Sequence, residues 1–281
     1  MTWLNGQQID CLPLPHRGLA YGDGLFETIR MEQGNVPLLD RHLIRLASSA
    51  NKLKFTNQSA ISEITDITQM VVDSLPVPVT GVLKIILLRS HQGRGYRHET
   101  DNKFDLIHEF YPAESMDMGW NMKSLHLGCC QSRVSVNPTL AGHKHLNRLD
   151  SVMAAKECYE NGWDDGLLFS DDQVIETTSA NVFVIKDAVL STPRIEKAGV
   201  RGVSRDLILE HSKNCFEQVL EANLYFSDLK AADFIFVTNA VIIARPVSRL
   251  FYGQEIKDYN SQNQLFNTLI NLLSGVLKGE K

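Results

Sequence analysis

Lys144 lies between His143 and His145, directly before a stretch whose apolar residues repeat at helical spacing. A lysine on such a connection is usually a solvated surface charge. The same amine can instead form a Schiff base with a carbonyl group of a cofactor. The two flanking histidines lack a third ligand, so they do not indicate a metal site. Taken alone, this segment favours the surface interpretation.

Glu176 opens a run in which small hydroxyl residues follow a carboxylate. Strand alternation places Glu176 on the face opposite Ile175. A carboxylate in that position suits the protonated nitrogen of a heteroaromatic ring, where it strengthens the ring's capacity to take up an electron pair. An exposed strand residue is the plainer interpretation, and it is favoured until another feature agrees.

Three further features suit the binding of an anion. Gly199 and Gly202 precede a predicted helix, so backbone N–H groups there can point at a phosphate, although the Gly-Lys-Ser/Thr ending of a P-loop is absent. Arg45 lies on another predicted helix and can make a bidentate contact, or a surface ion pair. A basic loop with Arg94 and Arg97 suits either a carboxylate substrate or an exposed turn.

The composition narrows the class of protein. The 281 residues are 43% hydrophobic and 22% charged, which predicts a sizeable core, and the net charge of -5 argues against a general nucleic-acid binder. Five cysteines without a C-x-x-C pair suggest neither a disulfide framework nor a zinc site, and a reducing cytoplasm fits them best. No secretory signal and no apolar stretch long enough for a bilayer is visible, so no membrane partner is expected.

The predicted elements form two consecutive α/β parts. A hairpin is expected around Asn5 and Gly6, and a second strand pair around Gly34 and Asn35. The spacing predicts helices around residues 43–53 and 61–71 and over 147–162, 203–215 and 261–277, and strands over 81–88, 104–111 and, as consecutive short ones, 166–193. We therefore expect an N-terminal domain over residues 1–113, a linker over 114–120 and a C-terminal domain over 121–281.

In their order along the chain, these segments resemble fold-type IV pyridoxal-phosphate enzymes, the class of branched-chain and D-amino-acid aminotransferases. The resemblance covers nearly the whole chain and is carried by residues 21–28, 41–46, 144, 176–181 and 199–205. Within the class, the lysine segment 137–150, the loop 93–96 and Thr28 are similar to those of aminodeoxychorismate lyases. Aminotransferases of the class usually have other residues around the lysine.

The resemblance implies a mixed α/β (α+β) fold with a small N-terminal α/β domain, a larger C-terminal domain with a β-barrel-like sheet, and pyridoxal 5'-phosphate between them. By position, Lys144 matches the Schiff-base lysine and Glu176 the partner of the pyridine nitrogen. Thr28 would orient a water or the leaving oxygen, and Arg94 and Arg97 would bind substrate carboxylates. The resemblance assigns phosphate contacts to four residues: Arg45, Val203, Asn239 and Ala240. It also implies a homodimer.

The implied reaction converts 4-amino-4-deoxychorismate to 4-aminobenzoate and pyruvate, a step of folate biosynthesis, through a Schiff base with the substrate amine. In this mechanism the freed Lys144 removes the proton from the amine-bearing carbon, and aromatisation drives the loss of pyruvate. An aminotransferase of the same class is the nearest alternative, but it needs a 2-oxo acid as acceptor. A non-catalytic binding module that keeps the fold is a remote alternative, because both Lys144 and Glu176 are present.

Overall fold

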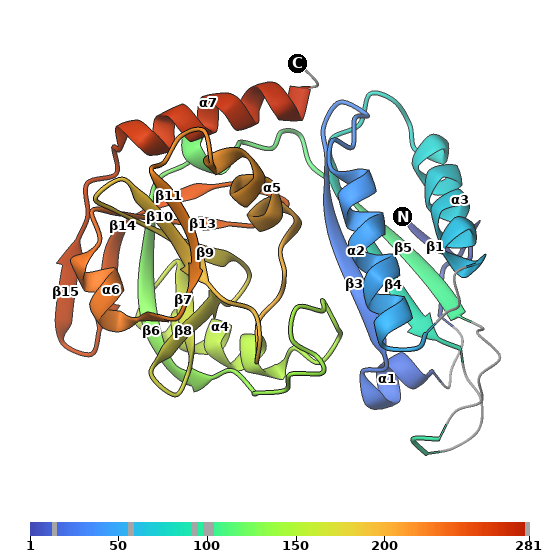
Figure 1. Cartoon of the computed structure of the whole chain (residues 1–281). Helices are drawn as coiled ribbons and strands as arrows, with labels where there is room; N and C mark the ends of the chain where they lie inside the picture. The colour runs from blue at the N-terminus through green and yellow to red at the C-terminus, as the bar shows by residue number, and fades with distance from the viewer. Residues whose placement is uncertain (13–15, 56–58, 91–94, 98–103, 279–281) are drawn as a thin grey trace. The chain divides into compact units, whose positions relative to one another are not determined.

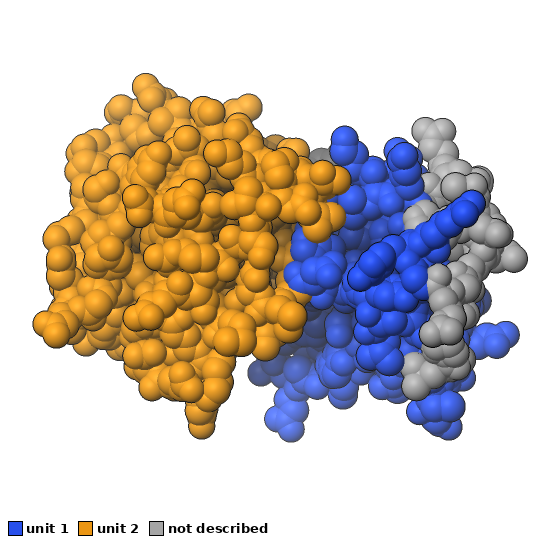
Figure 2. All heavy atoms as spheres, turned by 90° about the horizontal axis from the view of Figure 1, so that it is seen from below, with its two compact units in different colours: residues 1–116, 143–147 blue, residues 117–142, 148–281 orange. Residues whose placement is uncertain are grey.

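The structure is a computed structural model that describes residues 1–12, 16–55, 59–90, 95–97 and 104–278 (Figure 1). The chain forms two compact units, coloured separately in Figure 2. Unit 1 comprises Met1–Met116 and His143–Asn147, and unit 2 comprises Asp117–Gly142 and Arg148–Lys281. The predicted mixed α/β class is confirmed. The domain limits at 113 and 121 stay a prediction.

Unit 1 is a five-stranded antiparallel sheet with the strand order β2-β1-β5-β4-β3. Its strands are β1 (Thr2–Leu4), β2 (Gln7–Gln8), β3 (Gly24–Met31), β4 (Gly81–Arg89) and β5 (Phe104–Pro112). Its helices are α1 (Arg17–Tyr21), α2 (Leu39–Lys52) and α3 (Ser59–Ser74). The predicted first hairpin is confirmed, because Asn5 and Gly6 turn the chain with φ values of 48° and 82°.

The core of unit 1 lies between the sheet and the helices α2 and α3, which cover one face of the sheet (Figure 1). Leu25, Ile29 and Met31 point inwards from β3, as the two-residue period of a strand requires. Leu43 and Leu46 meet them from α2. The helical spacing read from the sequence therefore identified the buried face of α2 correctly.

The predicted second strand pair around Gly34 and Asn35 is wrong. β3 pairs with β4 along its whole length, and only one isolated bridge joins Glu32 to Asn35. Pro37 follows almost at once and has no N–H to donate to a ladder, and α2 begins at Leu39. The chain after the turn is therefore too short to form a strand.

Unit 2 is built on a ten-stranded mixed sheet with the order β11-β10-β9-β13-β14-β6-β7-β8-β12, with β15 paired to β14. The strands are β6 (Leu125–Arg133), β7 (Asp165–Ser170), β8 (Gln173–Thr177), β9 (Asn181–Lys186), β10 (Val189–Pro193), β11 (Gln218–Ala222), β12 (Leu224–Tyr225), β13 (Phe234–Thr238), β14 (Arg245–Tyr252) and β15 (Glu255–Asp258). The helices are η1 (Gly119–Asn121), α4 (Leu149–Asn161), α5 (Val203–Ser212), α6 (Phe226–Ala231) and α7 (Gln264–Lys278). Every residue of β7 and β13 is buried, so both faces of these strands are covered.

The three helices predicted after residue 146 are confirmed. α4 ends as expected at Gly162, which adopts the left-handed conformation with a φ of 68°. α4 buries Ala154 and Cys158, whereas Leu149 and Met153 are exposed. Among the described residues, no helix is both long and apolar enough to cross a membrane.

Candidate active site

Lys144 belongs to unit 1, where its segment extends the edge of β3. The N–H of Phe26 donates to the carbonyl of Lys144 at 2.9 Å, and the N–H of Leu146 donates to the carbonyl of Gly24 at 2.9 Å. His145 forms an antiparallel bridge with Leu25. The backbone of Lys144 is therefore fixed by a strand ladder, and the interpretation as a loose surface lysine is wrong.

The side chain of Lys144 lies against β3. Its Nζ is 4.1 Å from the centroid of the Phe26 ring, and the residue is half-buried. Thr28 is two residues further along β3, so it lies on the same face of the strand as Phe26. Thr28 is also half-buried. The structure thus places Thr28 on the strand face that Lys144 contacts through Phe26.

His143, directly before Lys144, is bonded to α2. His143 Nδ1 is 2.9 Å from the hydroxyl oxygen of Ser49 on α2. Within the described part of the chain, no group of three or more histidine, cysteine, aspartate or glutamate side chains could hold a metal ion.

The opposite face of β3 carries Glu27, which is 1% exposed and forms a charged cluster with α2. Arg45 Nε donates to Glu27 Oε1 at 2.9 Å, and a second guanidinium nitrogen of Arg45 contacts Oε2. His42 Nδ1 is 2.6 Å from Glu27 Oε2. Arg45 therefore forms an ion pair, as the plainer sequence interpretation held, but the pair is internal.

The charge states within this cluster follow from its contacts. Burial would raise the pKa of Glu27, but the charge of Arg45 and the hydrogen bonds from His42 and Arg45 outweigh it and lower the pKa to about 2. Burial lowers the pKa of His42 more than Glu27 raises it. At neutral pH, an anionic Glu27 accepts a hydrogen bond from a neutral His42, and the guanidinium of Arg45 is held in one orientation.

Sequence reasoning missed the roles of Glu27 and His42. The available signal was alternation, because Glu27 stands between the inward-facing Leu25 and Ile29 on the same side of β3. A charge on a buried strand face needs a partner. His42 and Arg45 are three residues apart on one helix face, which is the spacing that supplies two partners to one carboxylate.

Glu176 belongs to unit 2 and is buried on β8, so it is not the exposed strand residue that the plainer interpretation favoured. Its Oε2 accepts a hydrogen bond from the N–H of Val200 at 2.8 Å, and Arg148 Nη1 lies 3.9 Å from its Oε1. Gly199 has a φ of +89°, and a Cβ there would lie 3.0 Å from Ile175 Cγ2. The turn at Gly199 therefore requires glycine in order to bring a backbone N–H to the carboxylate.

The turn from Gly199 to Gly202 leads directly into α5. Gly202 is the N-cap, and a Cβ there would lie 2.2 Å from Asn181 Oδ1. Asn181 Nδ2 donates to the carbonyl of Val200 at 2.8 Å, which holds the turn in place. The first N–H groups of α5, beginning at Val203, have no partner within the helix, which is the arrangement that favours an anion.

The loop after β13 lies beside the start of α5. Ser204 Oγ donates to the carbonyl of Asn239 at 3.1 Å. Asn239 Oδ1 accepts hydrogen bonds from the N–H groups of Val241 and Ile242 at 2.9 and 3.0 Å. Unit 2 therefore brings together the loop with Asn239 and Ala240 and the predicted phosphate contact at Val203.

The structure describes only one of the two arginines that were predicted to bind the substrate. Arg94 lies outside the described residues, and Arg97 is exposed. The neighbouring Gly95 is anchored to α1, because Arg17 Nη1 donates to its carbonyl at 2.9 Å and its N–H donates to the hydroxyl oxygen of Tyr21 at 3.1 Å. The contact of either arginine with a substrate stays a prediction.

Comparison with known proteins identifies the class. The sequence model of the family described as Amino-transferase class IV matches residues 24–250. The chain belongs to this family, and the predicted resemblance is confirmed.

Three relatives refine this placement. The chain is 31% identical over 251 residues to the aminodeoxychorismate lyase of Vibrio harveyi, covering 88% of this chain and 90% of the relative. The solved 4-amino-4-deoxychorismate lyase of Pseudomonas aeruginosa matches with a TM-score of 0.85 and 29% identity, over 97% of this chain and 98% of that one. The D-alanine aminotransferase of Listeria monocytogenes is 25% identical over 235 residues, covering 83% of this chain and 80% of the relative.

Proposed function

We propose that this chain is a pyridoxal-phosphate-dependent aminodeoxychorismate lyase, which converts 4-amino-4-deoxychorismate to 4-aminobenzoate and pyruvate. The observation that carries the proposal is the position of Lys144, whose backbone is bonded into the edge of β3 instead of lying on a solvated loop. The similarity to lyases over nearly the whole chain supports this assignment over others within the family.

Covalent connectivity supports placing Lys144 and Glu176 in one site. Gly142 donates its N–H to the carbonyl of Gly199 at 2.8 Å, and the next residue, Val200, donates to Glu176. Lys144 follows Gly142 by two residues, so the Cα atoms of the two residues are at most about 7 Å apart. Along the chain, Lys144 thus follows within two residues of Gly142, which bonds to the turn that binds the carboxylate.

The residues present fit pyridoxal phosphate. The start of α5 offers N–H groups that have no partner within the helix, at a turn where a Cβ on Gly202 would collide with Asn181. Glu176 is a buried carboxylate for a ring nitrogen, and Lys144 is an amine fixed by its backbone. When bound, pyridoxal phosphate supplies an aldehyde for an amine and a ring that takes up an electron pair.

Each residue of the proposed site then has a defined task. Glu176 holds the proton on the ring nitrogen, and Lys144 moves a proton from the amine-bearing carbon of the substrate. Thr28 orients a water or the leaving oxygen. Arg94 and Arg97 are the proposed partners of the substrate carboxylates. The residues proposed to bind the phosphate are Arg45, Val203, Asn239 and Ala240.

Replacement of the lysine tests this proposal. We expect Lys144→Ala to abolish the formation of 4-aminobenzoate and the yellow absorbance of the protein with pyridoxal phosphate together, because one amine serves both. Lys156→Ala is the control, since Lys156 is exposed on α4 and contacts Glu160 and the Tyr159 ring. Normal turnover by Lys144→Ala would overturn the proposal.

An aminotransferase is the second candidate, and the similarity to the D-alanine aminotransferase favours it. It would use Lys144, Glu176 and Arg45 in the same way, so these residues do not separate the two activities. The requirement for an acceptor distinguishes the two activities, because an aminotransferase needs a 2-oxo acid and a lyase releases pyruvate without one.

We also propose that the chain forms a homodimer in the cytoplasm. α4 exposes an apolar stripe in which Leu149, Val152 and Met153 are 76%, 57% and 60% exposed. Apolar groups gathered on one helix face usually mark a contact with another chain. The five cysteines are all free thiols, which suits a reducing compartment.

A further inference from the structure

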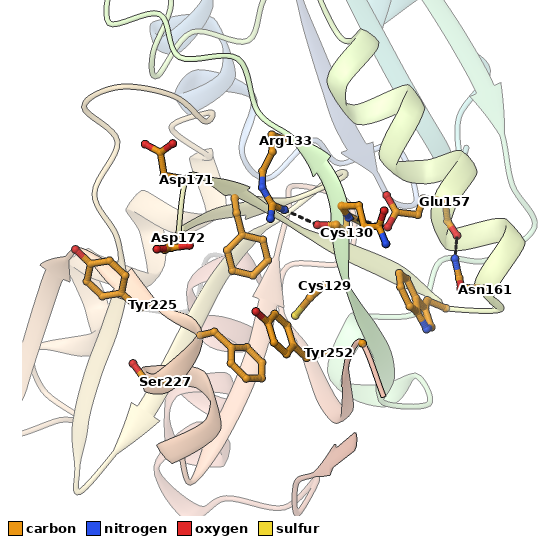
Figure 3. Close-up of a pocket in the computed structure, with 15 residues that line it drawn as sticks. Cys129, Cys130, Arg133, Glu157, Asn161, Asp171, Asp172, Tyr225, Ser227 and Tyr252 are labelled. Atoms are coloured by element: carbon orange, nitrogen blue, oxygen red, sulfur yellow. Dashed lines mark hydrogen bonds between the residues drawn. The ribbon is translucent and has the colours of Figure 1, made fainter. Parts of the chain in front are cut away.

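Unit 2 contains a cavity of about 610 Å³ that is separate from the proposed cofactor site (Figure 3). Its walls come from β6, β7, α4, α6 and the end of β14. None of the residues assigned above to the cofactor or the substrate lines it. Its volume lies within the range of roughly 300–1,000 Å³ that is typical of pockets for small molecules.

Aromatic rings form much of the wall. Phe226 and Tyr252 stack with their centroids 3.9 Å apart and their planes inclined by 20°. Tyr225 and Tyr252 keep 45% and 46% of their surface exposed. The guanidinium carbon of Arg133 lies 5.4 Å from the centroid of the Phe169 ring. An aromatic face of this wall therefore already holds a cation.

The charges around the cavity are mostly negative. Three carboxylates, those of Glu157, Asp171 and Asp172, line it together with the single guanidinium of Arg133. Figure 3 shows Asp171 and Asp172 at the same side of the cavity as Tyr225. No hydrogen bond or ion pair joins either aspartate side chain to another residue of the described ranges.

The other charged groups of the wall are already engaged. Glu157 accepts hydrogen bonds from the N–H groups of Gln131 and Ser132 at 2.7 and 3.1 Å. Arg133 Nη1 donates to the carbonyl of Cys130 at 2.6 Å. Burial raises the pKa of Cys129 to about 12, so its thiol is neutral at pH 7. The two aspartates are thus the charges that remain to meet a ligand.

We propose that this cavity binds an organic cation, an ammonium group carried on an apolar or aromatic body. The body would lie against Phe226 and Tyr252, and the ammonium group would face Asp171 and Asp172. An anion would meet three carboxylates, and a neutral molecule would gain nothing from the exposed Asp171 and Asp172. This site is independent of the proposed lyase activity.

Three small probes that share a benzyl group and differ in charge test the proposal by calorimetry on the full chain. They are benzyltrimethylammonium, benzyl alcohol and phenylacetate. A quaternary ammonium cannot react with an aldehyde, so binding at the cofactor site through a Schiff base is avoided. We expect the cation to bind about tenfold more tightly than the alcohol, and the carboxylate to bind least. Added pyridoxal phosphate should leave the Kd of the cation unchanged.

Matched variants locate the binding. Asp171→Asn/Asp172→Asn should weaken the cation about fivefold and leave the alcohol unaffected. Asp187→Asn is the control, because Asp187 occupies an equivalent turn with a φ of 47°, against 51° for Asp171, and does not line the cavity. Equal affinity for the three probes, preferential binding of phenylacetate, or no binding of the cation to the unmodified chain would overturn the proposal. An unchanged Kd in the double variant would do the same.

Discussion

At the scale of single residues, the buried carboxylate of Glu27 determines how Arg45 is presented. The two make a two-point contact, and His42 binds the same carboxylate from one turn earlier on α2. In the proposed site, the first N–H groups of α5 would bind the phosphate through a turn that requires glycine, whereas Arg45 would bind it through a side chain that must be held in place. We therefore assign Glu27 and His42 to positioning the guanidinium of Arg45.

Removing the charge of Glu27 tests this assignment. Glu27→Gln leaves the guanidinium of Arg45 without its counter-charge, and we expect a loss of about 3 kcal/mol in the free energy of unfolding, measured in urea. Pyridoxal phosphate should also bind more weakly in an absorbance titration. Glu255→Gln is the control, because its ion pair with Lys230 is exposed, and such pairs contribute less than about 1 kcal/mol. Equal losses in both variants would contradict the assignment.

The sequence indicated which residue types could do chemistry but not all of their partners. Local patterns raised Lys144, Glu176 and the two glycines before α5 as candidates, and the resemblance to a known family assigned their roles. The structure shows the local contacts of each. Glu27 and His42 were missed because their roles depend on β3 and α2 packing against each other. A local pattern does not identify that contact. A charged residue at an inward-facing strand position indicates only that a partner is needed.

At the scale of elements, a buried histidine links β5 to α3. His108 Nε2 is 3.0 Å from the hydroxyl oxygen of Thr68, and both residues are 0% exposed. Burial lowers the pKa of His108 from 6.5 to about 4. The unfolded chain therefore binds a proton between pH 6.5 and 4 that the folded chain does not bind, so acid favours unfolding over this window.

The stability of the chain should accordingly fall by about 2–3 kcal/mol through His108 as the pH falls from 6.5 to 4. His108→Leu combined with Thr68→Val removes both polar groups, so we expect a shallower dependence on pH at a similar stability near pH 7. Urea unfolding of both chains at several pH values checks this. A pH dependence that is the same in the two chains would show that His108 does not titrate as described.

The turn into α5 offers a second test at this scale. Gly202→Ala should displace the side chain of Asn181 and weaken pyridoxal phosphate about tenfold, because the N–H groups at the helix start would move. Absorbance titration measures the affinity. Adding Asn181→Ala removes the colliding atom and should recover part of the loss. Full affinity in Gly202→Ala alone would argue against a phosphate at this turn.

Turn chemistry explains which elements were predictable. Asn5 and Gly6 both adopt positive φ, and the sequence signal for that hairpin was sufficient. The same signal at Gly34 and Asn35 failed, because the partner of β3 comes from β4, 50 residues further along the chain. A turn motif predicts that the chain reverses, but the strand that fills the edge depends on the packing of the whole sheet.

At the scale of the whole molecule, the passage of residues 143–147 into unit 1 was not predictable. These five residues are flanked on both sides by unit 2, and their bonds to β3 join positions more than a hundred residues apart. Helical spacing and strand alternation describe neighbours within a segment, so they carry no information about such a crossing. The resemblance to a known family supplied the function of Lys144 without supplying this placement.

The exposed apolar stripe on α4 predicts that the proposed dimer depends on this helix face. Leu149→Glu/Met153→Glu places charges within the apolar stripe, and we expect it to convert a dimer into a monomer in sedimentation velocity. Lys257→Glu, which changes the charge of an exposed lysine on β15 instead of α4, should stay dimeric. A monomeric unmodified chain, or a double variant that stays dimeric, would contradict the proposed interface.

The central claim is that this member of the amino-transferase class IV family works as a lyase. Its most direct test supplies 4-amino-4-deoxychorismate and pyridoxal phosphate to the purified chain without any 2-oxo acid, and measures both products. We predict equal amounts of 4-aminobenzoate and pyruvate over many turnovers. Activity that appears only after a 2-oxo acid is added would contradict the claim and identify an aminotransferase.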